Sequence, residues 1–437
     1  MATTKYSHAF LVGKFNGDVT PESLAKNGWE QQILTQEEYN DRLSMYYKSH
    51  VDAMMEADGQ QKPDFLKDVH HYKISYEEMR RNDPGYYEIC KVGEPVSISF
   101  RNNEELVSFT FMLCNLHLYL FPFNITLVAI EIDDNGSEID QLRMAHRQLI
   151  NWEENINTIA SKEFLQSLSP IAKLLPDENL ATLVEDGNNL KIFQIVQLDN
   201  KCPDDKLLFE IATFSPIGSV CGNESYSLSE EYFNKLIKEN TVSTYYNWKA
   251  LSLVDSFTVL AGEGFGSWQW TNLYFPLIYL RCIFEKTFCF SRNNIYRLGQ
   301  QKATKQLSEE IADMERYYFY STISYNFQPN LVYASIAKGL DIEAERKELA
   351  RQVKEMAKKE MEEKKEKEEH RRDLITLGLS IFAVFSVTWD LCSLIKDAFT
   401  NKDDHLTPMI SLWIALTVIV IFALYFFIIK KKDNEKN

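Results

Sequence analysis

The chain has 437 residues, of which 45% are hydrophobic and 25% are charged, so it can bury the cores of two or three domains. Its formal net charge of −16 excludes a general nucleic-acid coat, because phosphate binding needs concentrated Lys and Arg, and we expect no direct nucleic-acid binding. The seven cysteines are scattered and form no C-x-x-C pair, which indicates reduced thiols rather than disulfides or a zinc site.

Residues 1–300 are predicted to form a mixed α/β cytosolic domain. No basic and apolar leader precedes Gly13, so no signal peptide is predicted. Apolar, β-branched runs predict strands at 8–15, 96–100, 190–198, 207–214 and 251–260. Longer amphipathic runs predict helices at 36–56, 137–158, 229–239 and 269–290. This order predicts a sheet with helices packed on it, without a clean βαβ repeat.

An uncharged run at 106–130 is compatible with a membrane span or with two buried strands. Phe121-Pro122-Phe123-Asn124 is typical of a turn, and each flank has strand length, so we predict the strand pair. His117 within this run and the adjacent pair His70 and His71 are predicted to be core or surface residues rather than zinc ligands.

A glycine-rich segment, Gly262-Glu263-Gly264-Phe265-Gly266-Ser267, follows a predicted strand and precedes a predicted helix. Backbone N–H groups of Gly262, Gly264 and Gly266 are candidates to hold an anion at the helix start, with Trp268 stacking a purine. The segment departs from G-x-G-x-x-G and has no Walker lysine. The alternative is that Trp268 and Trp270 belong to the core.

Helical periodicity dominates residues 301–373. A helix is predicted from Lys302 to Asn326, ended by Gln328-Pro329, and a second from Leu331 is expected to continue without a break into the membrane. From Asp341 to Asp373 there are 11 basic and 12 acidic residues, which predicts a charged stalk, with a solvated linker helix as the alternative. An apolar stripe at heptad-like spacing opens this stalk and fades after Met356.

Two membrane helices are predicted near the C-terminus, at 374–395 and 406–429. They reach about 33 and 36 Å, against a hydrocarbon core of about 30 Å. Basic residues precede the first span and follow the second, whereas the connection at 396–405 is acidic. The positive-inside rule therefore predicts an outer loop and a basic cytosolic tail at 430–437, with both termini cytoplasmic.

One face of the first predicted span is small and polar. Steps of four and three residues place these side chains along that face: Thr376, Ser380, Ala383, Val387, Asp390 and Asp397. An intramembrane carboxylate usually faces water or a partner, so we predict that these residues line a pore. Two helices cannot enclose a pore, which implies a homo-oligomer. The alternative is that Thr376 and Ser380 bond to their own helix while Asp390 snorkels.

This layout resembles the CorA family of magnesium channels, which are homopentamers. The resemblance covers the architecture of the whole chain, most closely Lys302 to Lys432, and includes the terminal Lys430-Lys431-Lys432. The family's Gly-Met-Asn signature at the outer end of the first span is absent. That place reads Lys396-Asp397-Ala398-Phe399-Thr400-Asn401, and only Asn401 echoes the signature.

The CorA-like proteins without that signature include a branch associated with type III CRISPR systems. This resemblance implies a pentameric effector in the bacterial inner membrane, gated by a nucleotide second messenger, the conjugate of S-adenosylmethionine with AMP. The first alternative is a CorA-type transporter with Mg²⁺ as its ion, and the second is a membrane-tethered scaffold or enzyme. No nucleophile–base pair or metal-spaced carboxylate set stands out, so we predict that the chain is not an enzyme.

Overall fold

The apolar run that hydropathy left ambiguous forms two strands of a sheet in the computed structural model. Strands β5 (Glu105–Phe121) and β6 (Ile125–Asp134) pair antiparallel around a turn in which Phe123 and Asn124 have φ of 64° and 58°. Phe123 is held there by packing against Phe288, with ring centroids 4.9 Å apart. The predicted strand pair is therefore confirmed.

The structure describes residues 3–17, 19–56, 69–76, 93–102, 105–134, 136–185, 189–199, 203–220, 228–297, 304–400 and 413–414. The chain divides into two units, Met1–Val353 and Lys354–Asn437. The first unit extends past residue 300 and includes helices that the sequence placed with the stalk. The second span at 406–429, residues 401–405 of the outer loop and the basic tail lie outside the described residues, apart from 413–414.

The first unit is built on a sheet with strand order β2-β3-β5-β6-β1-β7-β10-β9-β8, and β4 also pairs with β5. All pairs are antiparallel except β7 with β10. The other strands are β1 (Thr4–Lys14), β2 (Glu30–Gln31), β3 (His70–Ser75), β4 (Glu94–Asn102), β7 (Lys191–Leu198), β8 (Thr241–Val242), β9 (Trp248–Ser252) and β10 (Ser256–Ala261).

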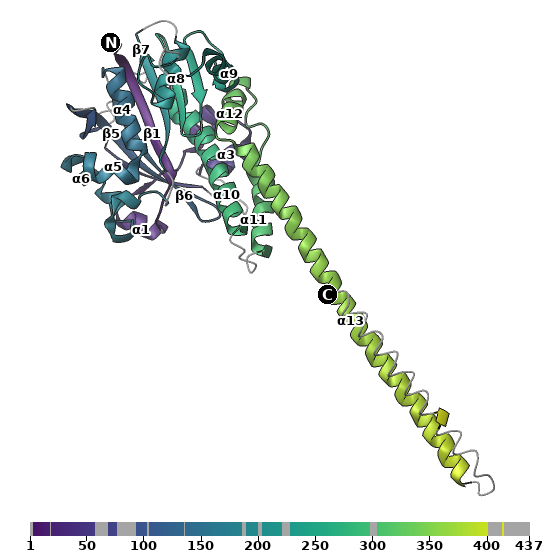
Figure 1. Cartoon of the computed structure of the whole chain (residues 1–437). Coiled ribbons are helices and arrows are strands. Elements are labelled where there is room, and N and C mark those ends of the chain that lie inside the picture. The colour runs from purple at the N-terminus through teal and green to yellow at the C-terminus, as the bar shows by residue number, and fades with distance from the viewer. Residues whose placement is uncertain are drawn as a thin grey trace. The chain divides into compact units, whose positions relative to one another are not determined.

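Helices cover both faces of this sheet (Figure 1). On one face, Ala9 and Leu11 of β1 share a core with α4 (Ile139–Ile150), α5 (Trp152–Ile159), α6 (Lys162–Ser167) and α8 (Asp205–Thr213). On the other face, Phe10 stacks on Phe275, with ring centroids 3.6 Å apart. The other helices described in the first unit, before α13, are α1 (Pro21–Lys26), α2 (Gln36–Leu43), α3 (Lys48–Met54), α7 (Ser169–Ala172), η1 (Pro176–Glu178), η2 (Leu180–Thr182), α9 (Glu230–Asn240), η3 (Trp270–Tyr279), α10 (Leu280–Arg297), α11 (Thr304–Tyr317) and α12 (Phe327–Gly339).

The predicted strand at 207–214 is wrong, because this segment forms α8. Asp204 caps the helix by accepting a hydrogen bond from Leu207 N at 3.0 Å, and Phe214 ends it in the left-handed conformation. The predicted strand at 251–260 is two strands, β9 and β10. The predicted helices at 36–56 and 137–158 are each divided in two, the second at Asn151.

The helix predicted at 269–290 begins as a π-helix, η3, before α10 continues it. Pro276 lies inside η3 and lacks the N–H that an α-helical turn needs, and its ring crowds the carbonyl four residues earlier. The i to i+5 pattern avoids that carbonyl, and the N–H of Leu280 donates to Phe275 O. The wider turn carries Phe275 onto the sheet.

The predicted continuous helix from Leu331 is also wrong. Pro329 lies in the first turn of α12, where a missing N–H is tolerated, so α12 starts at Phe327 rather than after the proline. It ends at Gly339, and Asp341 has φ of 54°. The helix α13 (Ile342–Thr400) starts after this break and includes residues 396–400, which the sequence assigned to the outer loop.

Helix α13 opens with buried Ile342, Leu349 and Met356, as the apolar stripe predicts, and the described side chains from 357 to 373 are exposed. Within the described part of the chain, one helical segment, 342–391, is long and apolar enough by length and composition to cross a membrane. Phe382, Phe385 and Trp389 in it are each at least 70% exposed.

Gly339 gives a test of how α12 packs on the sheet. A Cβ added there would lie 2.7 Å from the backbone carbon of Ser252 in β9. We expect Gly339→Ala to lower the free energy of unfolding by about 1–3 kcal/mol, because overpacking forces backbone shifts. Denaturant titration of the full chain in detergent measures this. Gly266→Ala, where a Cβ meets nothing within 4 Å, is the control. Equal stabilities would contradict the packing.

Candidate ligand-binding site

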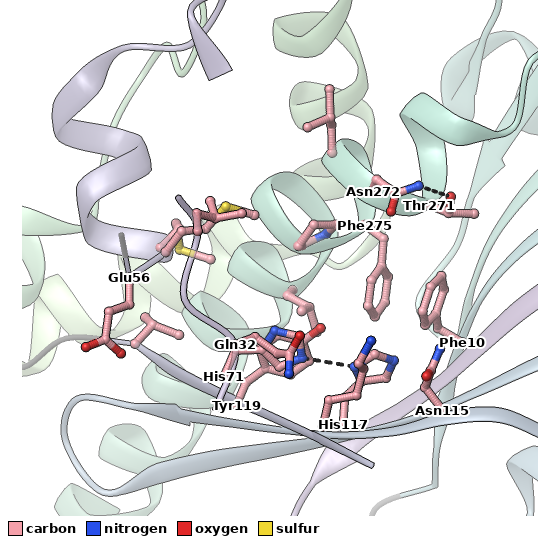
Figure 2. A pocket seen from close by; sticks show the side chains of 18 of the residues that line it. Phe10, Gln32, Glu56, His71, Asn115, His117, Tyr119, Thr271, Asn272 and Phe275 are labelled. Carbon is pink, nitrogen blue, oxygen red and sulfur yellow. Dashed lines mark hydrogen bonds between the residues drawn. The ribbon is translucent and has the colours of Figure 1, made fainter. Parts of the chain in front are cut away.

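A cavity of about 320 Å³ lies in the first unit, between the sheet and η3. Its floor is formed by β1, β3, β5 and β6, and α2, α3, η3 and residues 32–34 supply walls. Figure 2 shows His71, Tyr119 and His117 on the sheet side and Asn272, Thr271 and Phe275 on the helix opposite. The polar lining residues are Gln32, Glu38, Glu56, His71, Lys73, Asn115, His117, Tyr119, Glu131, Thr271 and Asn272.

A β-bulge in β5 places the polar floor. Before the bulge, Phe111 and Leu113 face the core beneath α4 and α5. The register with β6 shifts between Leu113 and Asn115, so one extra residue, Cys114, is inserted. Because side chains alternate, this insertion sends the following odd positions to the opposite face, where Asn115, His117 and Tyr119 line the cavity.

The floor side chains form a connected polar network. Glu131 Oε2 accepts from Asn115 Nδ2 and lies 3.0 Å from His117 Nε2. His117 Nδ1 lies 2.9 Å from His71 Nε2, the contact dashed in Figure 2. Behind the floor, His8 lies between Glu131 and Asp133, with its Nε2 3.1 Å from Glu131 Oε1. The network thus runs from the cavity into the sheet.

Burial sets the protonation of His71. Desolvation holds the pKa of His71 well below its usual range, and the nearby charge of Lys73 lowers that pKa further. His71 is therefore neutral at pH 7. Burial likewise raises the pKa of Tyr119, which stacks on His71 with ring centroids 4.2 Å apart, so this phenol stays protonated.

Of the four glycine-loop candidates, only Trp268 lines the cavity, where it is 38% exposed. Gly262, Gly264 and Gly266 lie after β10 and before η3, as the sequence predicts, but they do not line it. Gly264 has φ of 75°, and Gly262 O accepts from Gln197 Nε2 at 3.3 Å. Trp270 is buried against Trp248, so the core alternative holds for it.

The predicted pore residues all lie on one helix, α13. Thr376 Oγ1 donates to Arg372 O at 2.9 Å and Ser380 Oγ donates to Thr376 O at 2.7 Å, the backbone bonds that the alternative interpretation expected. Such bonds leave a hydroxyl's acceptor lone pairs open. The one-face arrangement from Thr376 to Asp397 requires an unbroken helix, which α13 provides.

A second buried polar cluster links the cavity wall to the last helices of the first unit. Arg281, next to the cavity residue Leu280, donates from Nε to Glu285 Oε1 at 2.8 Å and from Nη1 to His50 Nδ1 at 2.7 Å. Its Nη2 donates to Tyr318 O, and its guanidinium lies 5.2 Å from the ring centre of Tyr333 in α12. We call these residues the Arg281 cluster.

Helix α10 continues this linkage to the first turns of α13. Lys286 Nζ lies 3.1 Å from Glu345 Oε1, and Asn293 Nδ2 donates to Glu345 Oε2 at 2.8 Å. Arg346 stacks over the ring of Phe319, 3.9 Å from its centre. Helix α10, whose first residue Leu280 lines the cavity, therefore also holds the start of α13.

Sequence reasoning missed the floor, including His71, Asn115, His117 and Glu131. The signal was there: Asn115, His117 and Tyr119 alternate with leucines inside an apolar run, and Glu131 and Asp133 alternate with isoleucines. That pattern predicts a strand with a polar stripe on one buried face, which needs partners from neighbouring strands.

No protein-family model, curated protein or solved structure matches the chain. Among the described residues, no group of three or more His, Cys, Asp or Glu side chains has an arrangement that holds a metal ion. Cys114, Cys282 and Cys289 are buried and form no disulfide.

The Arg281 cluster makes a prediction about stability. Arg281→Met leaves the buried carboxyl group of Glu285 without its partner, which typically costs about 3–5 kcal/mol. We expect Arg281→Met with Glu285→Leu to recover most of that loss, because both charges are then gone. Denaturant titration of the full chain measures both. Lys358→Met, in an exposed pair with Glu362, is the control and should change little. A small effect of Arg281→Met would show that this cluster does not hold the fold.

Proposed function

We propose that this protein is a ligand-gated, CorA-like homopentameric channel of the bacterial inner membrane, with both termini cytoplasmic. Its cytosolic α/β domain binds a small ligand in the cavity beneath η3, and α13 carries the response into the membrane. The trigger we propose is the conjugate of S-adenosylmethionine with AMP, as in a type III CRISPR antiviral effector. The observation that carries this proposal is a polar cavity whose wall helix also holds the start of α13.

The size and chemistry of the cavity support a small-molecule ligand. Its volume of about 320 Å³ falls within the usual range for ligand pockets, about 300–1,000 Å³. Aromatic rings of Phe10, Tyr119, Trp268 and Phe275 line the cavity, and the partly exposed Trp268 is the one placed to stack on a planar group. The charged lining groups are three carboxylates and one ammonium, which suits the ammonium and sulfonium end of the conjugate better than its phosphate.

The helices around the cavity support a response to the ligand. Met54 on α3 and Leu280 at the start of α10 line the cavity, and the Arg281 cluster ties α3 to α10 and α12. Lys286 and Asn293 then hold Glu345 on α13. A ligand that favours one position of α3 over another therefore acts on residues that contact α12 and α13.

The apolar part of α13 supports a membrane assembly. Its large side chains, among them Phe382, Phe385 and Trp389, are exposed in the single chain, and exposed apolar surface of this extent needs lipid or partner helices. The polar face from Thr376 to Asp390 is costly in lipid. Several chains around an axis satisfy both faces at once. A CorA-type Mg²⁺ transporter and a membrane tether are the alternatives that the experiments below distinguish.

Ligand binding and assembly give the first test. We expect the full chain in detergent to be a pentamer by mass photometry, and calorimetry to show at least about tenfold tighter binding of the conjugate than of AMP. Asn272→Trp places bulk at the exposed rim of the cavity and should weaken binding without affecting assembly. Gly266→Trp, in the glycine loop, is the matched control and should bind normally.

Contrary results point to the alternatives. A monomer or dimer would support the tether. Millimolar Mg²⁺ binding without conjugate binding would support the transporter. Weakened binding in Gly266→Trp alone would place the ligand at the glycine loop.

The conducting path gives the second test. Five copies of Asp390 near the outer mouth form an acidic ring, and such rings favour cations. In vesicles containing the full chain, we expect Asp390→Asn to preserve assembly and to reduce the conjugate-triggered cation flux severalfold. Phe385→Ser, away from the polar face, should weaken assembly and leave ion preference unchanged. Unaltered flux and preference in Asp390→Asn would show that Asp390 does not line the path.

A further inference from the structure

The order of protons along the floor network follows from its carboxylate. Glu131 faces the amide nitrogen of Asn115 and ring nitrogens of His117 and His8, which is the arrangement of an ionised carboxylate accepting hydrogen bonds. His117 Nε2 therefore carries a proton that it donates to Glu131. With His117 neutral, its single N–H lies on Nε2 and its Nδ1 is an acceptor.

The position of the proton on His71 follows in the same way. Its Nε2 lies 2.9 Å from His117 Nδ1 and must donate to it, so a neutral His71 holds its single proton on Nε2. His71 Nδ1 is then an acceptor on a side chain that lines the cavity, and it has no hydrogen-bond partner among the described residues. The network thus presents a lone pair, rather than an N–H, to whatever binds.

The groups around His71 also favour a positively charged ligand, because most of them are hydrogen-bond acceptors or carboxylates. The amide nitrogen of Asn115 is committed to Glu131, and its Oδ1 is buried without a partner in the described part of the chain, so its dipole places negative charge under the floor. Glu38, Glu56 and Glu131 line the cavity against one ammonium, that of Lys73. The indole of Trp268, which lines the cavity and is 38% exposed, also attracts cations.

We propose that the floor of this cavity is a subsite for an ammonium group, whose N–H donates to His71 Nδ1 while Glu131 supplies the opposing charge through the histidine relay. This assignment rests on the proposed function in that it concerns the ligand of the same cavity. It names the ligand's class: an organic cation with a primary amine and a planar body that lies against the aromatic walls.

Three indole compounds of similar size test the assignment on the full chain in detergent by calorimetry. Tryptamine is cationic, tryptophol is neutral and indole-3-propionate is anionic. We expect tryptamine to bind at least about tenfold more tightly than indole-3-propionate, with tryptophol between them. Equal binding, a preference for the carboxylate, or no binding of any probe at millimolar concentration would overturn the assignment.

Two variants on β3 should act in opposite directions. His71→Phe keeps a ring to stack on Tyr119 but removes the acceptor, so most of the preference for tryptamine should be lost. Lys73→Met removes the one competing cation, so tryptamine should bind more tightly and indole-3-propionate more weakly. If His71→Phe does not fold, Lys73→Met still decides: an unchanged preference there would count against the assignment.

This test is separate from that of the proposed function. Probe binding needs neither a membrane nor a channel, whereas the function is measured as conjugate-triggered flux. A preference for tryptamine without conjugate-triggered flux would leave the subsite and remove the channel trigger. Conjugate-triggered flux without a preference for tryptamine would support the channel trigger and remove the subsite.

Discussion

The inserted residue at Cys114 is the constraint on which the cavity depends. Strand β5 pairs with β4 at its start and with β3 at its end, and its odd-numbered side chains face the apolar core before the insertion and the cavity after it. Without the insertion, the alternation that buries Phe111 and Leu113 beneath α5 would carry Asn115 and His117 into the same apolar core. Burying those polar groups among hydrocarbon side chains costs several kcal/mol. The bulge instead sends them to the face that η3 covers.

Once the polar side chains share that face, the cross-strand register completes the site. Asn115 pairs with Glu131, which pairs with Phe10, and His8 pairs with Asp133. Each buried donor therefore finds a carboxylate on the next strand. The π-helix lies opposite this floor, where its Phe275 packs on Phe10 and Pro276 also lines the cavity. The cavity lies between the part of the sheet that follows the bulge in β5 and the π-helix η3.

The two polar clusters of the first unit have different characters. The Arg281 cluster is sealed, and its guanidinium is held by Glu285, His50 and the carbonyl of Tyr318. The floor network opens on a cavity at His71. A sealed ion pair fixes the relative positions of α3, α10 and α12, whereas an open network leaves bonding capacity for a ligand. Because Leu280 and Arg281 are adjacent in sequence, the cavity lies next to the helices that hold the start of α13.

The local sequence pattern determined those strands and helices whose formation depends only on residues close together in the chain. The strands β1, β4, β5, β6 and β7, the turn after Phe121, the apolar stripe from Ile342 and the long helix through Asp390 all follow from periodicity and turn chemistry. The same signals failed where a cap or a contact between distant segments decides. Residues 207–214 are apolar enough for a strand, yet Asp204 caps them as a helix.

The site itself was decided by tertiary structure. His71, Asn115, His117 and Glu131 come from three strands, and their meeting requires a register and a bulge that no local pattern specifies. The close approach of Gly339 to Ser252 in β9 and the stacking of Phe275 on Phe10 likewise join segments that are distant along the chain. Side-chain periodicity is a property of a few consecutive residues, so it predicts elements. Which buried polar groups satisfy one another is a property of the whole sheet, because each needs a partner that is distant along the chain.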